Sequence, residues 1–64
     1  MVRINGENLD VVSKSVAEYL ASAGYDLMRV AVELNGDIVP KVQYADTKFK
    51  DGDNVEVVSF VGGG

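Results

Sequence analysis

Residues 55–64 read VEVVSFVGGG and end the chain. An apolar run with the spacing of a β-strand leads into three glycines and then the terminal carboxylate. Glycine has no Cβ and accepts most φ/ψ values, so an extended arm of glycines can enter a narrow cleft. The stretch therefore predicts a folded body whose last strand continues into a thin, reactive arm. A frayed terminus without a role is the competing interpretation.

The two faces of this last strand predict different contacts. Val55 and Val57 share one face, and successive side chains alternate in a strand. Val58 and Phe60 share the other face. A sheet covered by one helix leaves its second face open to water, where polar residues are expected. If the first pair packs against the helix, the second points outward beside the arm and, with Val61, predicts a protein-docking patch. The alternative is that the loop before this strand folds over Phe60 and buries it.

Two Asn-Gly pairs further upstream indicate hairpin turns, because both residues tolerate positive φ. Residues 2–5 alternate between apolar and polar side chains, Asn5-Gly6 supplies the first turn, and the alternation resumes over residues 9–11. The same signals recur in the second half of the chain. Residues 30–34 alternate, and Asn35-Gly36 then predicts a turn.

The strand after this second turn is expected at residues 38–39. Pro40 follows it and lacks a backbone donor, so this strand is predicted at an edge of the sheet. Residues 41–50 show no clean period and are interpreted as a loop with one helical turn. Residues 50–53 predict a turn before the final strand.

A short helix is expected between the two hairpins. The hydroxyl of Ser15 can cap its first turn and Glu18 completes a capping box, with Ser13 as a competing start. Gly24 is expected to end the helix. Its predicted apolar face consists of Val16, Leu20 and Ala23. Its predicted water-facing stripe consists of Ser15, Glu18 and Ser22.

The predicted order is β-β-α-β-β-β, which is typical of the α+β class. One helix between two hairpins must cross the sheet, and the last strand then fills the centre beside the first. By analogy this is the β-grasp, or ubiquitin-like, fold: a mixed sheet with one main helix on one face. We expect one domain at residues 1–61 and a flexible functional tail at residues 62–64.

Composition excludes several classes of function. The chain of 64 residues contains neither cysteine nor histidine, so a thiolate nucleophile, a histidine base and the usual zinc ligands are all missing. We therefore expect no catalytic residue and no metal site. The net charge of −4 argues against binding of nucleic acid. No apolar run approaches the ~20 residues that span a membrane, so a cytoplasmic protein is expected.

The arm itself suggests a chemistry. Four residues beyond Phe60 reach about 13 Å when extended, which is enough to enter a partner's active site. A free carboxylate is a poor acyl donor. Activation with ATP gives an acyl-adenylate, from which a sulfur nucleophile can displace AMP. The chain has no group for this work, so a partner enzyme must perform it.

In three stretches the chain resembles the ThiS family, the sulfur carriers of thiamine thiazole biosynthesis. They are RVAVELNGDIVP at 29–40, KDGD at 50–53 and VVSFVGGG at 57–64. The resemblance implies that a ThiF-like enzyme adenylates the carboxylate of Gly64 with ATP and magnesium, while Gly62 and Gly63 thread its active site. Sulfur from a cysteine desulfurase would then form a thiocarboxylate, and a ThiG-like thiazole synthase would accept it. The chain itself would bind no cofactor.

Three other interpretations stay open at this point. MoaD-like carriers of molybdopterin synthesis also end in paired glycines but tend to be longer. A ubiquitin-like protein modifier would use the same activation of Gly64 and end on a lysine. A plain interaction module would carry the glycines without using them.

Overall fold

A computed structural model describes residues 1–60, which form a five-stranded mixed sheet in the order β2-β1-β5-β3-β4 with one α-helix. The predicted α+β order is confirmed, and two short 3₁₀ helices are added to it. The elements are β1 (Val2–Ile4), β2 (Glu7–Leu9), α1 (Val16–Ser22), η1 (Leu27–Arg29), β3 (Val30–Leu34), β4 (Asp37–Ile38), η2 (Lys41–Gln43) and β5 (Asn54–Ser59). Val61, Gly62, Gly63 and Gly64 lie outside the described residues.

Both predicted hairpin turns are present. Asn5 and Gly6 have φ values of 50° and 85°, and Asn35 and Gly36 have 52° and 89°. Positive φ at both central residues gives the turn twist that matches the twist of paired strands. The strands differ slightly from the prediction: β2 ends at Leu9 because the chain leaves the sheet there, and β4 covers 37–38. The short β4 lies at the edge, as Pro40 predicted.

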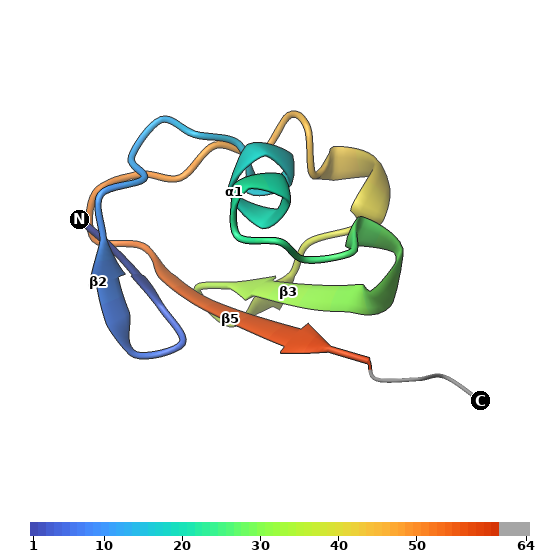
Figure 1. Cartoon of the computed structure of the whole chain (residues 1–64). Coiled ribbons are helices and arrows are strands. Elements are labelled where there is room, and N and C mark those ends of the chain that lie inside the picture. The colour runs from blue at the N-terminus through green and yellow to red at the C-terminus, as the bar shows by residue number, and fades with distance from the viewer. Residues whose placement is uncertain (61–64) are drawn as a thin grey trace.

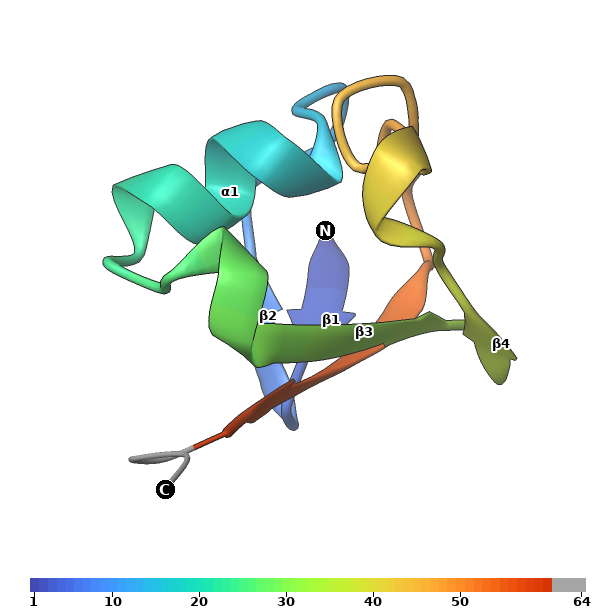
Figure 2. The same cartoon turned by 90° about the vertical axis from the view of Figure 1, so that its right-hand side faces the viewer.

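β5 occupies the centre of the sheet. It pairs parallel with β1, where Arg3 lies opposite Asn54, and antiparallel with β3 from Val30 to Leu34. Figure 1 shows β5 running the length of the sheet beneath α1. In the turned view of Figure 2, α1 and η2 lie on the same side of the sheet, and no element within residues 1–60 covers its other face. The last strand is therefore held on two sides and has one open face.

The capping box of α1 is confirmed. The Glu18 N–H donates to the Ser15 hydroxyl at 3.0 Å, and the Ser15 N–H donates to the Glu18 carboxylate at 2.9 Å. Two details of the predicted helix faces are wrong. Ser15 is buried, because it also bridges to Lys48 as an isolated β-pair, and Ala23 is exposed, because the helix ends at Ser22. None of the helices within residues 1–60 has the length and apolar character to cross a membrane.

The loop at 41–50 contributes more to the core than its sequence pattern indicated. It contains the predicted helical turn, η2, and it also buries Tyr44 and Phe49. The Phe49 ring meets Tyr19 edge-on at a centroid distance of 6.0 Å. The buried core is Val2, Ile4, Val16, Leu20, Val30, Val32, Val39, Tyr44, Phe49, Val55 and Val57. An irregular segment thus closes the side of the core that the short α1 leaves uncovered.

The capping carboxylate predicts a pH dependence of stability. Hydrogen bonds from the backbone and the hydroxyl of Ser15 hold the pKa of Glu18 below its ordinary value of 4.5. Because the folded pKa is the lower one, this stabilisation is present above about pH 4.5 and is lost as the pH falls through the folded value. We expect Glu18→Gln, which can still accept the Ser15 N–H bond, to unfold at a lower temperature than wild type at pH 7 and at nearly the same temperature at pH 3. Thermal unfolding across this range measures the difference.

Ala21, an exposed residue of the same helix, provides the control for this prediction. Ala21→Ser changes no titratable group, so its difference from wild type should stay nearly constant from pH 7 to pH 3. An undiminished advantage of wild type over Glu18→Gln at pH 3 would contradict the role given to the Glu18 charge.

Candidate functional site

The two faces of β5 have different surroundings. Val55 and Val57 are 1% and 8% exposed and belong to the core, whereas Val58 and Phe60 are 54% and 55% exposed. The prediction that Val58 and Phe60 point outward is confirmed, and the alternative that the 41–50 loop buries Phe60 is wrong. Because the loop packs on the α1 side of the sheet, it leaves the outer face of β5 free (Figure 2).

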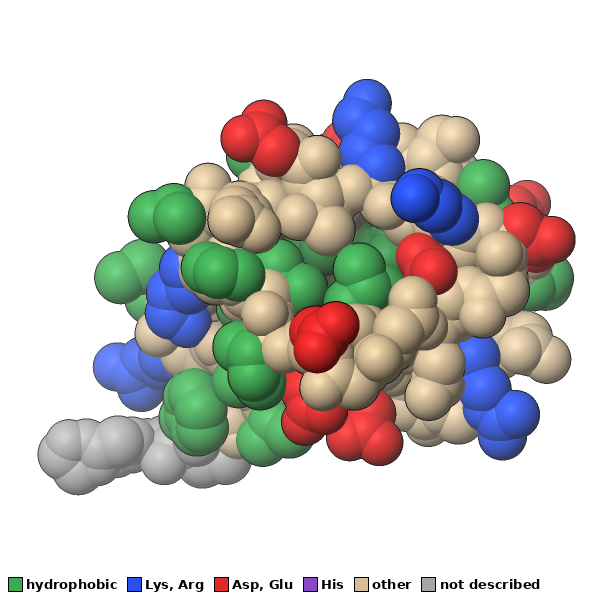
Figure 3. Space-filling view, turned by 180° about the vertical axis from the view of Figure 1, so that it is seen from behind, with side chains coloured by type: hydrophobic (Ala, Val, Ile, Leu, Met, Phe, Trp, Pro, Cys, Tyr) green, Lys and Arg blue, Asp and Glu red, His purple; other side chains and the backbone are tan. Residues whose placement is uncertain are grey.

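Neighbouring backbone holds these outward side chains in place. Ala31 of β3 lies directly opposite Val58. The Phe60 N–H donates to the Arg29 carbonyl at 2.7 Å, so pairing with β3 continues one residue past the end of β5. We define the outer patch as Ala31, Val58 and Phe60. In Figure 3, hydrophobic side chains gather at the end of the molecule where β5 stops. The outer patch is thus an apolar surface on a rigid ladder.

Charged groups border the outer patch. Glu33 of β3 and Glu56 of β5 lie directly opposite each other, and the pair Val32–Val57 separates them from Ala31 and Val58. Like charges in this position destabilise a sheet by roughly 0.2–1 kcal/mol, because both carboxylates project from the same face. A cationic side chain of a partner would relieve this repulsion. The face therefore combines an apolar centre with charges of both signs, because Arg3 lines the same hollow as Glu56 and Val58.

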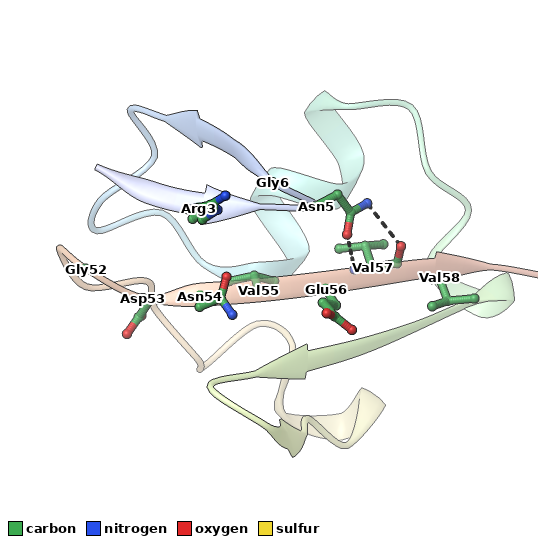
Figure 4. Close-up of a pocket in the computed structure, with 10 residues that line it drawn as sticks. All are labelled: Arg3, Asn5, Gly6, Gly52, Asp53, Asn54, Val55, Glu56, Val57 and Val58. Carbon is green, nitrogen blue, oxygen red and sulfur yellow. Dashed lines mark hydrogen bonds between the residues drawn. The ribbon is translucent and has the colours of Figure 1, made fainter.

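A side chain from the first hairpin fastens β5 from its other edge. The Val57 N–H donates to the side-chain oxygen of Asn5 at 2.9 Å, and the Asn5 amide nitrogen donates to the Val57 carbonyl at 3.1 Å. Figure 4 shows both bonds, with the Asn5 amide beside β5. Asn5 thereby makes the two bonds that a further residue of β1 would otherwise make. The strand stays paired on both edges through Val57, shortly before the outer patch ends.

The residues predicted for the site are divided between two regions. Val58 and Phe60 lie together on the outer face, while Val61 and Gly62–Gly64 fall outside the described part of the chain. Sequence reasoning missed the contact of Asn5 with Val57, because the Asn-Gly signal indicates only a turn. It also missed the opposed carboxylates, which depend on strand register. Within residues 1–60, no cluster of three or more acidic side chains could hold a metal ion.

Comparison with known proteins gives the site its context. The model of the ThiS family matches residues 2–64. The sulfur carrier protein ThiS of Thermus thermophilus is 39% identical over 64 residues, covering 100% of both chains. A thiazole synthase of Paramagnetospirillum magneticum is 47% identical over 62 residues, which cover 95% of this chain but 19% of that protein. The chain therefore spans about a fifth of the length of that relative.

A solved structure shows the same architecture. The crystal structure of a thiamine biosynthesis protein (ThiS) from Geobacter metallireducens superposes with a TM-score of 0.77 and 36% sequence identity. The likeness covers 98% of this chain and 97% of that one. The β-grasp fold expected from the order of elements is therefore confirmed, with β5 as its central strand.

Proposed function

The chain belongs to the ThiS family and is a sulfur carrier protein of thiamine biosynthesis, and we propose that it carries sulfur as a thiocarboxylate on Gly64. One observation supports this most directly: the exposed outer patch lies at the end of the central strand, and Gly62–Gly64 follow it closely in the sequence. A partner that docks on Val58 and Phe60 has the terminal carboxylate within about 13 Å, the reach of four extended residues.

The proposed reaction needs a second protein. The Gly64 carboxylate attacks the α-phosphorus of ATP and releases pyrophosphate, which leaves an acyl-adenylate. Sulfide attacks the acyl carbon and displaces AMP, so that sulfur replaces one carboxylate oxygen. Where the donor is a persulfide, an acyl disulfide forms first, and a second thiol must cleave it to release the thiocarboxylate, becoming part of a disulfide itself. The chain contains no cysteine or histidine to assist either step. We assign ATP and magnesium to a ThiF-like adenylating enzyme in the cytoplasm, and the sulfur to a cysteine desulfurase. The chain acts as their protein cosubstrate.

The proposed acceptor of the sulfur is a ThiG-like thiazole synthase. The similarity to part of the Paramagnetospirillum magneticum thiazole synthase supports this choice, because it associates a segment of this kind with that activity. The net charge of −4 on the whole chain adds an electrostatic preference for a partner surface that carries basic groups.

Intact mass spectrometry tests the proposed function. The chain is incubated with ATP, magnesium, sulfide and the ThiF-like enzyme of the same genome. We expect a mass increase equal to the exchange of one oxygen for sulfur, localised to Gly64 by fragmentation. An unchanged mass, with an enzyme that adenylates its own control substrate, would contradict the proposal and favour a modifier or an interaction module.

A substitution in the outer patch tests docking. Phe60→Ala removes an exposed aromatic anchor, and truncation of such an anchor typically costs ~2 kcal/mol of binding, or about thirtyfold in Kd. The free energy of unfolding should fall by less than about 1 kcal/mol, because the ring is half exposed. Titration calorimetry with the adenylating enzyme and urea denaturation give the two values.

Val42→Ala is the matched control for docking. Val42 is 87% exposed and lies in η2, on the α1 side of the sheet (Figure 2). It should change neither Kd nor stability. An unchanged Kd for Phe60→Ala together with a large loss of stability would show that Phe60 supports the fold instead of docking.

A further inference from the structure

The backbone of β5 directs its hydrogen-bonding groups alternately to its two edges. The Asn35 N–H donates to the Asn54 carbonyl at 2.7 Å, and the Phe60 N–H donates to the Arg29 carbonyl at 2.7 Å. In an antiparallel ladder every second residue bonds to the same neighbour, so residues 54, 56, 58 and 60 face β3. The backbone groups of Val55, Val57 and Ser59 therefore face the β1 edge.

Two of these three residues have partners at the β1 edge. The Val55 carbonyl accepts the Asn5 N–H at 3.0 Å, and Val57 makes both of its bonds with the Asn5 side chain. β1 stops at Ile4, and the chain turns back into β2. Within residues 1–60, no strand pairs with β5 beside Ser59, and Ser59 is exposed. In the described part of the chain, the N–H and C=O of Ser59 are therefore unpaired at this edge, directly after the position that the Asn5 side chain occupies.

On the far side of β3, the corresponding backbone carbonyl is covered by side chains. The Val30 carbonyl, which points away from β5, accepts a bond from the Lys41 ammonium group at 2.6 Å. The Tyr44 hydroxyl lies 3.5 Å from the same oxygen. Folded proteins commonly cover exposed strand edges in this way, since unpaired edges recruit other strands. Val30 lies opposite Ser59 in the ladder. The outward backbone carbonyl of Val30 is therefore covered, whereas the outward backbone groups of Ser59 are open.

We propose that the enzyme that acts on Gly64 docks by adding an extended backbone segment to β5 at Ser59. This inference rests on the proposed function, and it specifies how the partner engages the carrier. Because Gly64 lies five residues beyond Ser59, an active site that holds its carboxylate must come within about 17 Å of Ser59. The partner's surface therefore lies against this edge. Addition of a strand to an open edge is a common mode of recognition, with main-chain bonds supplying affinity.

Asn5 sets the register of this added segment. Its side chain fills both bonding groups of Val57, so an incoming strand cannot pair with Val57 and must begin at Ser59. The segment then runs beside the outer patch, where Val58 and Phe60 project from the adjoining face. The partner thus contacts β5 in two ways: through main-chain bonds at its edge and through apolar side chains on its face. Together these contacts fix how the carrier lies on the partner.

Proline substitution at position 59 tests this mode of docking. Ser59→Pro removes the N–H that, among residues 1–60, faces the open edge, and it leaves the bonds from β5 to β3 in place. Proline is tolerated in strands at such edge positions. Ser59→Ala is the matched control, because it removes the hydroxyl and keeps the N–H. We expect Ser59→Ala to bind the adenylating enzyme as wild type does, and Ser59→Pro to bind about tenfold more weakly, as for one lost hydrogen bond.

Amide hydrogen exchange on the wild-type chain provides a measurement that does not depend on a variant. The Ser59 amide should exchange rapidly in the free chain and slowly in the complex with the enzyme. Equal Kd values for Ser59→Pro and Ser59→Ala, or an unprotected Ser59 amide in the complex, would overturn the inference. Protection that rises with chain concentration alone would also overturn it, by showing that a second copy pairs with this edge.

The same samples distinguish the two proposals. If wild type gains the thiocarboxylate but the Ser59 measurements are negative, edge docking fails and the carrier function stands. If wild type is never activated by the enzyme, the proposed function fails, and edge docking fails with it.

Discussion

Deletion of Gly63 and Gly64 will abolish thiocarboxylate formation and leave the free energy of unfolding unchanged. The shortened arm carries its carboxylate about 7 Å closer to the folded body, which withdraws it from an active site built for the full length. The buried core lies between Val2 and Val57, so unfolding should change by less than about 0.5 kcal/mol. Intact mass after incubation with the adenylating enzyme, and urea denaturation, measure the two quantities.

Gly64→Ala is the companion variant, because it keeps the length of the arm and adds one methyl group beside the reacting carbon. We expect activation to be slowed by crowding at the phosphate, with binding of the enzyme largely retained. If the shortened chain still gained sulfur, the reach of the arm would be unimportant. If the chain without Gly63 and Gly64 still fully supported the function of its partner enzyme, the chain would be an interaction module.

Phe49→Ala is expected to give the largest loss of stability. The side chain is 2% exposed, and truncation of a buried phenylalanine costs about 3–5 kcal/mol. A chain of this size has a total stability of roughly 3–10 kcal/mol, so the variant should be largely unfolded or close to it. The segment around Phe49 also bonds to the chain before α1, through Ser13 and Lys14 at 2.9 and 3.0 Å. Circular dichroism in urea gives the midpoint.

Val42→Ala serves here as the control from the same irregular segment. Its side chain is solvated, so its midpoint should lie within error of wild type. Equal midpoints for the two variants would show that the Phe49 ring is not held in the core in solution.

The sequence predicted the elements of the sheet better than it predicted the packing of the loop. Asn5-Gly6 and Asn35-Gly36 mark their turns through local backbone preference, and Ser15 with Glu18 marks the helix start through local hydrogen bonds. These signals are complete within four residues of chain. Phe49 has no such signal, because residues 41–50 lack a period and their burial depends on a distant α1.

The candidate site shows the same division. Alternation along β5 was sufficient to place Val58 and Phe60 on one face, but only the three-dimensional structure shows that both stay more than half exposed. The contact of Asn5 with Val57 spans 52 residues of sequence. The sequence pattern around Asn5 does not reveal this contact, because the hairpin turn alone already accounts for an asparagine at that position.

The parallel pairing of β1 with β5 has a mechanical consequence. The first residues enter the sheet at the end where β5 begins, so a pull between Met1 and the end of β5 acts along both strands in opposite directions. The bonds that Arg3 and Asn5 make with the last part of the chain then share the load in shear and must fail together instead of opening one after another. When a force on the end of β5 is balanced at the N-terminus, the sheet therefore resists it in shear, and the folded body stays intact.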